Sequence, residues 1–391
     1  MSSKPSTGSP AEVFRAFLSL GLTSFGGPIA HLGYFRNAFV TRRAWLEEAA
    51  YADLVALAQF LPGPASSQVG FAIGLTRAGW LGGLAAWVGF TLPAAVALTA
   101  FAFLAERVEG RFGEGLLHGL QLVAVAIVAQ AVLGMARSLC PDPQRATLAV
   151  LALCAVSAHP GSAVQVAAIA MGGLAGLWIC RAQAGGGSPD ATSRVSPRAG
   201  ALCLGAFAVL LGLAFLPVRG QPFALAQAFY RCGALVFGGG HVVLPLLKSA
   251  VVDPGWVAEP AFLAGYGAAQ ATPGPLFAFS AYLGAVAQGL GGALVALVAI
   301  FLPGLLAMAG ALPFWRKLAG KPSARAAMAG VNASVVGLLA AALYNPVFVS
   351  GVRTPIDFAI AAAGFVALVA WRAPSVVVVA GVAAASALLA L

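Results

Sequence analysis

The segment Gln59–Pro64, which reads Gln-Phe-Leu-Pro-Gly-Pro, interrupts an apolar stretch and returns as Gln270–Pro275, Gln-Ala-Thr-Pro-Gly-Pro. A second motif is duplicated with it: Phe25–Gly27, Phe-Gly-Gly, recurs as Phe237–Gly239 after 212 residues (237 − 25). Similarity at a fixed interval indicates an internal repeat that covers most of the chain. Both motifs break helices. Paired broken helices in two related halves are typical of the binding site of a membrane transporter.

The composition is that of a membrane protein. Of the 391 residues 60% are hydrophobic and only 9% are charged, with a mean hydropathy of +0.92. Soluble proteins carry about 25% charged residues. Runs such as 80–104 and 116–136 contain no Lys, Arg, Asp or Glu. We therefore expect an all-α polytopic membrane protein, with the lipid bilayer as its main solvent. The polar start of the chain predicts no cleavable signal peptide.

The charged residues and the cysteines argue against several other classes of protein. The chain has 22 Lys and Arg against 12 Asp and Glu, an excess that suits loops following the positive-inside rule rather than nucleic-acid binding. The five cysteines form no CxxC pair, so neither a disulfide nor a metal site is expected. No HExxH, GxSxG or Walker A motif is present. We expect no enzyme and no cofactor.

The chain divides into two repeats and a connection. We assign residues 11–181 to an N-terminal repeat, 182–222 to a linker plus one connecting transmembrane segment, and 223–391 to a C-terminal repeat. The first part of the connection is rich in Gly, Ser and Pro, which is typical of a flexible link.

The loop charges predict that the two repeats are inverted relative to each other. Loop 36–48 carries three Lys or Arg and its counterpart 248–259 carries one, whereas loop 106–114 carries two and its counterpart 315–325 carries four. This reversal of bias is what inverted topology requires. It also leaves an odd number of crossings between loops 36–48 and 106–114, so the apolar segments 51–77 and 79–105 cannot both be simple spans. We expect the Pro-Gly-Pro segment 51–77 to be a re-entrant hairpin, and the same logic would make the Gly-Gly segments re-entrant.

The Pro-Gly-Pro segments predict the substrate site. Proline favours the first position of a helix, so a second arm should begin near Pro64, with Ser66, Ser67 and Gln68 in its first turn. Free backbone N–H groups and the helix dipole make such a terminus an anion site. The second copy offers backbone donors and only Thr272 nearby, so the first copy is expected to face the substrate. The alternative is that these residues only kink or closely pack the helices.

The candidate substrate-binding residues lie in or beside the duplicated motifs. They are Gly26, Gly27, His31, Gln59, Pro62, Gly63, Pro64, Ser66, Ser67 and Gln68 in the first half, and Gly238, Gly239, His241, Gln270, Thr272, Pro273, Gly274 and Pro275 in the second.

Several of these side chains have alternative roles. Each histidine is a proton carrier, an anion ligand or simply a ring satisfied by a neighbour. Gln59 and Gln270 either bind an oxyanion or satisfy backbone freed by the breaks. Arg36 and Lys248 either attract the anion at a vestibule or snorkel at the interface. The intramembrane amides Gln121 and Asn332 are expected to form interhelical hydrogen bonds.

These residues resemble a known family. The runs Phe17–Pro28, Ala30–Tyr34 and Gln59–Pro64, with Phe237–Gly240 and Gln270–Pro275 in the second half, are similar to the chromate transporter (chromate ion transporter, CHR) family in its long, two-domain form. The resemblance covers roughly residues 11–350. It implies a multi-pass protein of the bacterial inner (plasma) membrane that exports chromate and confers chromate resistance. Sulfate, an isosteric dianion, would be the competitor.

Two other functions stay open at this point. In the first alternative, the protein moves sulfate or another oxyanion inward or exchanges it. In the second alternative, the protein is a membrane scaffold or sensor that transports nothing. A homodimer is also left open by the sequence.

Overall fold

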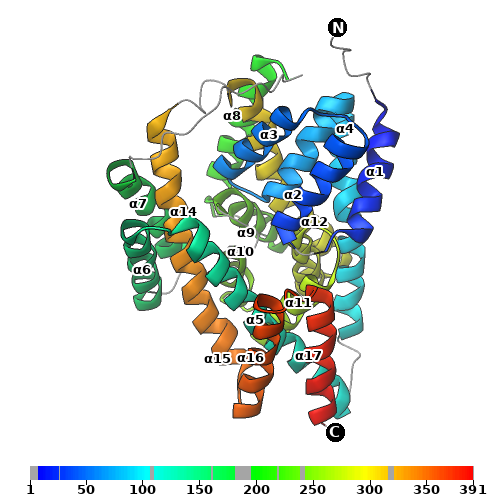
Figure 1. Ribbon diagram of the computed structural model, residues 1–391, viewed down its shortest axis with the longest axis vertical. Helices are drawn as coiled ribbons and strands as arrows, with labels where there is room; N and C mark the ends of the chain where they lie inside the picture. The colour runs from blue at the N-terminus through cyan, green and yellow to red at the C-terminus, as the bar shows by residue number, and fades with distance from the viewer. Residues whose placement is uncertain are drawn as a thin grey trace.

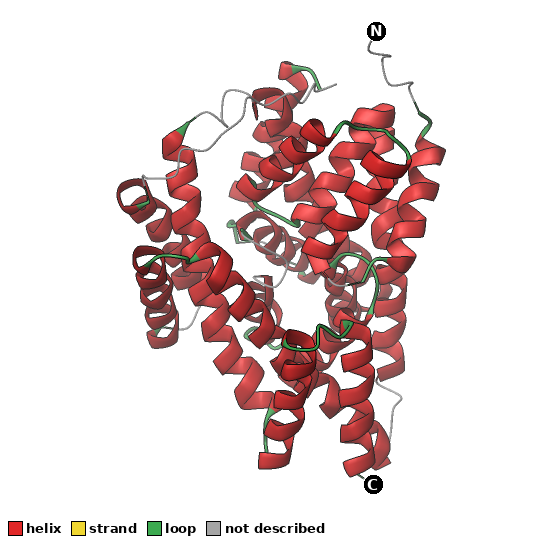
Figure 2. Ribbon diagram, in the orientation of Figure 1, coloured by secondary structure: helices red, strands yellow, loops and turns green. Residues whose placement is uncertain are grey.

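The computed structural model describes residues 8–25, 27–105, 110–159, 162–180, 195–217, 220–237, 243–315 and 321–390. Within these ranges the secondary structure is helical and contains no strand, which confirms the all-α expectation (Figure 2). Helices suit an apolar chain because each one closes its own backbone hydrogen bonds, which lipid cannot satisfy.

The elements form two series in the same order, separated by α8 (Pro197–Leu213). The first series is α1 (Pro10–Thr23), α2 (Gly27–Phe35), η1 (Arg36–Arg42), α3 (Glu48–Phe60), α4 (Ala65–Ala105), α5 (Gly110–Leu139), α6 (Pro143–Ala158) and α7 (Ser162–Ile179). The second is α9 (Gln221–Leu235), α10 (Val243–Leu247), η3 (Lys248–Val252), α11 (Glu259–Ala271), η4 (Leu276–Ala278), α12 (Phe279–Ala311), η5 (Leu312–Phe314), α14 (Pro322–Ala342), η6 (Leu343–Phe348), α15 (Val349–Gly351), α16 (Pro355–Val369) and α17 (Ser375–Leu389).

Helix caps show how closely the two series correspond. The Asp142 side chain accepts a hydrogen bond from the backbone N–H of Arg145 at the start of α6. Thr354 does the same for Asp357 at the start of α16, 212 residues later (354 − 142). A short polar side chain at this position satisfies a free N–H of the first turn. The repeat therefore places equivalent helix starts as well as equivalent breaks.

The Pro-Gly-Pro segments are the tips of helical hairpins. In the second half the Tyr282 hydroxyl donates to the carbonyl of Ala261 at 2.9 Å, which holds α11 antiparallel to the start of α12. In the first half the Arg77 guanidinium lies 5.0 Å from the ring centre of Trp45, so both outer ends of the hairpin share one face. The arm α3 has 13 residues, about 20 Å at 1.5 Å per residue, and it stops well short of a ~30 Å core. Hairpins of this length fit the predicted re-entrant segments.

A second reversal lies inside each long helix. Gly79 in α4 has φ +68° and Gly289 in α12 has φ +64°, a conformation that glycine adopts without steric cost. A Cβ added to Gly74 would overlap the carbonyl oxygen of Gly82, because the two arms of α4 touch after the turn. The sequence division between segments 51–77 and 79–105 falls at this turn.

The second arm of α4 packs against both arms of α12. Trp87 packs against Phe301 in the second arm with ring centres 5.8 Å apart, and Phe101 stacks on Tyr282 in the first arm at 5.7 Å. Figure 1 shows α3 toward the N-terminal end of the molecule and α11 toward the C-terminal end, the arrangement of an inverted repeat.

In the part of the chain that the structure describes, four helices are long and apolar enough to cross a bilayer, by length and composition: Ala65–Ala105, Gly113–Arg137, Leu276–Phe314 and Pro322–Gly351. With the shorter apolar helices, they make this a multi-pass membrane protein.

Candidate functional site

The break between α1 and α2 places a polar group in the apolar interior. His31 on α2 is only 1% exposed, and its ring meets Phe90 edge-on with centres 5.1 Å apart. Its Nε2 lies 3.2 Å from the carbonyl oxygen of Ser24, and its Nδ1 lies 3.4 Å from the hydroxyl oxygen of Ser66. The imidazole thus links the end of α1 to the first turn of α4.

The first turn of α4 carries the donors that the sequence predicted. The helix begins at Ala65, directly after Pro64, and Ser66 and Ser67 are each 2% exposed. The first N–H groups of a helix have no partner within it. The Ser67 hydroxyl has none in the described part of the chain, and neither has the Ser24 hydroxyl. Buried polar groups without partners are rare and costly, and here they gather beside the positive end of a helix dipole.

The two repeats are joined at their Pro-Gly-Pro tips. The N–H of Gly63 donates to the carbonyl of Val236 at 2.8 Å, and the N–H of Gly274 donates to the carbonyl of Ser24 at 3.0 Å. Gly63 has φ +117° and Gly274 has φ +104°, which turns each N–H toward the other half. Ser24 therefore receives hydrogen bonds from both His31 and the second tip.

Gln68 holds the first tip in place. Its Nε2 donates to the carbonyls of Pro62 at 2.8 Å and Gly304 at 3.1 Å. Both amide hydrogens are thereby used, and only the oxygen Oε1 lacks a partner among the described residues. An oxygen acceptor does not suit an anion, so Gln68 positions the loop against α12 rather than offering donors.

The second tip is less polar, as the sequence predicted. The first turn after Pro275 is the 3₁₀ segment η4, whose three apolar residues are buried. The Thr272 hydroxyl donates to the carbonyl of Ala268 at 2.9 Å, within its own helix. Gln270 is half-buried, with no partner for its Nε2 in the described ranges, whereas Gln59 is exposed. The duplicated glutamines therefore occupy different environments.

The two cations assigned to a vestibule form equivalent ion pairs. The Nε of Arg36 lies 2.7 Å from Glu48, and the Nζ of Lys248 lies 3.5 Å from Glu259. Lys248 also lines a cavity of about 190 Å³ with Ser249 and Asn345. Each carboxylate offsets part of the attraction that its cation would exert on an anion.

Four predicted site residues lie outside the described ranges, and they are Gly26, Gly238, Gly239 and His241. Gly27 begins α2 with φ +77°.

The sequence argument missed Ser24 and Thr91, two buried residues whose hydroxyls lack partners in the described ranges. The position of Ser24 directly before Phe25-Gly26-Gly27 was the available signal, since serine commonly stands at helix breaks.

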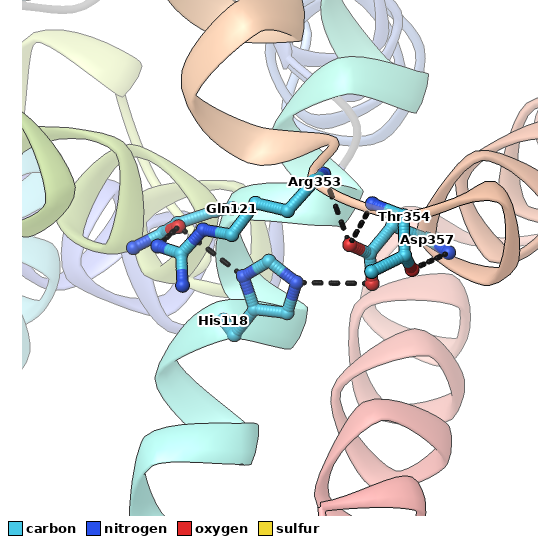
Figure 3. A network of polar contacts seen from close by, with 5 residues as sticks. All are labelled: His118, Gln121, Arg353, Thr354 and Asp357. Carbon is cyan, nitrogen blue, oxygen red and sulfur yellow. Dashed lines mark hydrogen bonds and ion pairs between the residues drawn. The ribbon is translucent and has the colours of Figure 1, made fainter.

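A separate polar network joins α5 to the start of α16 (Figure 3). The Asp357 carboxylate accepts from His118 at 3.1 Å and from the backbone N–H of Arg353 and Thr354 at 3.0 and 2.9 Å. Gln121 donates to the carbonyl of Pro260 on α11 at 3.2 Å, which confirms its predicted interhelical role. The pattern Thr-x-x-Asp before an apolar run could have indicated this capping box.

Among the described residues no cluster of His, Cys, Asp and Glu has the geometry to hold a metal ion. The buried Ser67 hydroxyl and the first N–H groups of α4 instead offer hydrogen-bond donors that have no partner among the described residues, which suits an oxyanion.

Comparison with known proteins identifies the family of this chain. The chromate transporter family model matches residues 11–177 and again residues 223–387. The chain is 30% identical over 383 residues to a chromate transport protein of Pseudomonas aeruginosa, covering 92% of this chain and 87% of that protein. It is 28% identical over 335 residues to a chromate transport protein of Cupriavidus metallidurans, covering 85% and 81%. No solved structure matches the chain significantly. With both repeats matched, this protein belongs to the chromate transporter family.

Proposed function

We propose that this protein exports chromate from the cytoplasm across the bacterial inner membrane and thereby confers chromate resistance. The observation that carries the proposal is the buried Ser67 hydroxyl in the first turn of α4, which has no hydrogen-bond partner among the described residues. A tetrahedral oxyanion placed there would receive hydrogen bonds from Ser67 and from the free N–H groups of the turn. The names of the relatives support chromate as that oxyanion.

The arrangement of the repeats supports alternating access. The tip of each inverted hairpin is bound to the other repeat, Gly63 to Val236 and Gly274 to Ser24, and Gln68 adds a bond from the first tip to Gly304. Rocking one repeat against the other around such a contact would open the site to either face in turn.

The membrane potential is sufficient to drive export of a dianion. An inside-negative potential contributes about 2.3 kcal/mol per charge per 100 mV. A chromate dianion leaving the cell would therefore be favoured by about 4.6 kcal/mol at ~100 mV, without ATP.

The test is chromate uptake by everted membrane vesicles from cells that express the protein. Saturable uptake that increases with a potential positive inside the vesicle is the expected result, since everted vesicles reverse the direction of export. Excess sulfate should inhibit uptake if the site accepts any tetrahedral dianion. Sulfate uptake without chromate uptake would favour a sulfate transporter, and no flux of either anion would favour a membrane scaffold or sensor.

A further inference from the structure

The partners of His31 determine which of its ring nitrogens carries hydrogen. Nε2 lies 3.2 Å from the Ser24 carbonyl oxygen, which can only accept. A neutral imidazole has one donor and one acceptor nitrogen. Nε2 must therefore carry the hydrogen, and Nδ1, 3.4 Å from the Ser66 hydroxyl, is left as the acceptor.

This tautomer fixes the direction of the Ser66 hydroxyl. With Nδ1 unprotonated, Ser66 donates its only hydrogen to His31. The remaining polar surface of the hydroxyl consists of oxygen lone pairs. In this state Ser66 repels an anion at the start of α4 instead of binding it.

Protonation of His31 reverses that direction. A hydrogen on Nδ1 would donate to the Ser66 oxygen, and the hydroxyl would turn its own hydrogen toward the site. The same event adds a positive charge beside the N-terminus of α4, where the helix dipole already favours a negative ligand. Both changes strengthen binding of a dianion.

Within the described part of the molecule, His31 interacts with Ser24, Ser66 and Phe90. The titratable and charged residues on α2 and on the elements packed around it are Glu12, Arg15, Tyr34, Arg36, Arg42, Glu48, Tyr51, Asp53 and Arg77.

Several of these groups have partners of their own. Arg77 pairs with Glu12, and Arg36 pairs with Glu48. The Tyr51 hydroxyl donates to a backbone carbonyl of α2, that of Leu32. Within the described residues, the hydrogen-bond partners of the His31 ring are a carbonyl and a hydroxyl rather than a carboxylate, and a bound dianion would be the counter-charge of a proton on His31.

We propose that His31 is the binding site of a proton that moves through the membrane together with the oxyanion. This inference rests on the proposed function. Anion binding and proton binding each strengthen the other by the same factor, as linkage requires. The proton enters on Nδ1 from the side where the anion loads and leaves with it, so each cycle moves one net negative charge instead of two.

The second repeat has neither side chain of the His31–Ser66 pair at the equivalent positions. Val243 stands at the position equivalent to His31, and Phe277 at the position equivalent to Ser66. Both are buried in apolar surroundings. One proton per anion is therefore the expected stoichiometry.

The experiment uses the full-length protein in liposomes that contain a pH-sensitive dye. Chromate flux and proton flux are measured together at a clamped potential, at a series of pH values from acid to alkaline. Wild type should move about one proton per anion, and its apparent affinity for chromate should fall roughly tenfold per pH unit in the alkaline range, the slope for one linked proton. Chromate itself takes up a proton, so the difference between wild type and His31→Gln at the same pH isolates the proton carried by the protein.

Three variants separate coupling from structure. His31→Gln should remove the part of the proton flux that the protein carries, leaving only the protons taken up by chromate itself. Ser66→Ala should weaken chromate binding about tenfold throughout the pH range in which the bound state is protonated, including the range where affinity falls with pH. The loss should disappear only at still higher pH, where affinity no longer changes and the anion binds beside a neutral His31. A purely structural role of Ser66 would weaken binding equally in both ranges. His118→Gln, a histidine in the separate network with Asp357, should leave the proton coupling unchanged.

Other outcomes overturn the inference. Chromate flux with the same pH profile in wild type and in folded His31→Gln would show that His31 carries no coupled proton. A Ser66→Ala effect that persists unchanged at high pH, where affinity no longer depends on pH, would remove the hydroxyl switch, even if His31→Gln fails to fold. Absence of chromate flux in wild type at every pH would reject the proposed function itself.

Discussion

The backbone N–H of Gly63 donates to the carbonyl of Val236, across 2.8 Å and between two repeats that are far apart in the sequence. In the equivalent contact, the backbone N–H of Gly274 in the second repeat donates to the carbonyl of Ser24 in the first, at 3.0 Å. Each re-entrant tip is thus bound to the residue that ends the first helix of the other half. Any movement of one repeat past the other has to act on these two contacts.

Replacing Gly63 by alanine should destabilise this contact. Gly63 has φ +117°, and a Cβ there would come within 2.8 Å of the Gly304 Cα. Backbone strain of this kind costs about 1–3 kcal/mol, and the clash adds to it. We expect Gly63→Ala to lower the thermal unfolding midpoint of the purified protein, followed by intrinsic fluorescence in detergent.

Gly79→Ala is the matched control for that variant. Gly79 also has a positive φ, +68°, but a Cβ there would meet nothing within 4 Å. The Gly79→Ala variant should lose only the stability that corresponds to the backbone strain, about 1–2 kcal/mol. Equal losses in the two variants would mean that the approach of Gly63 to α12 is not tight.

Ser67→Ala should separate stability from binding. The Ser67 hydroxyl is buried and has no partner among the described residues, so its removal should leave thermal stability unchanged or slightly higher. A hydrogen bond to a charged group contributes about 1.5–3 kcal/mol, so the concentration of chromate for half-maximal uptake should rise at least tenfold.

The control for Ser67→Ala is a buried serine that does have a partner. Ser280 on α12 donates to the carbonyl of Phe277 at 2.8 Å and is fully buried. Ser280→Ala should lower stability by about 1 kcal/mol and leave chromate affinity alone. If Ser67→Ala instead transports normally, the anion does not bind in the first turn of α4.

Single cysteines should show the inverted topology. Thr41 and Asp253 are exposed and equivalent in the two repeats, 212 residues apart (253 − 41). In a variant whose five native cysteines are replaced by alanine, Thr41→Cys and Asp253→Cys should react with a membrane-impermeant maleimide from opposite faces. We would compare intact cells with everted vesicles. Labelling of both from one face would contradict the inverted arrangement in Figure 1.

The network of Figure 3 should support the fold rather than transport. Asp357→Asn keeps one oxygen acceptor but loses the charge that receives hydrogen bonds from His118, Arg353 and Thr354. We expect a loss of about 1–3 kcal/mol in stability, with unchanged chromate flux per folded molecule. Asp142→Asn, at the cap of the equivalent helix α6, should be milder because Asp142 caps its own helix and pairs with its neighbour Arg145 rather than with a distant helix. A reduced flux in folded Asp357→Asn would instead place this network in the transport cycle.

The sequence by itself determined the class of protein and the positions of its breaks. The apolar composition requires helices in a bilayer, and the duplicated Gly and Pro residues act on the backbone of their own segment. For that reason the start of α4 after Pro64, the turn near residue 78 and the polar contrast between Ser66-Ser67 and η4 were all predictable.

Only the tertiary structure decided what these residues meet. Gly63 faces Val236, Gln68 gives its two hydrogens to Pro62 and Gly304, and His31 stands between Ser24 and Ser66. Local rules gave Gln68 and Ser67 the same expected role as donors to an anion. Packing separated them, because α12 brings a carbonyl within reach of Gln68 and leaves Ser67 without one. Which buried donor stays free depends on contacts between distant segments, and a pattern within one segment carries no information about them.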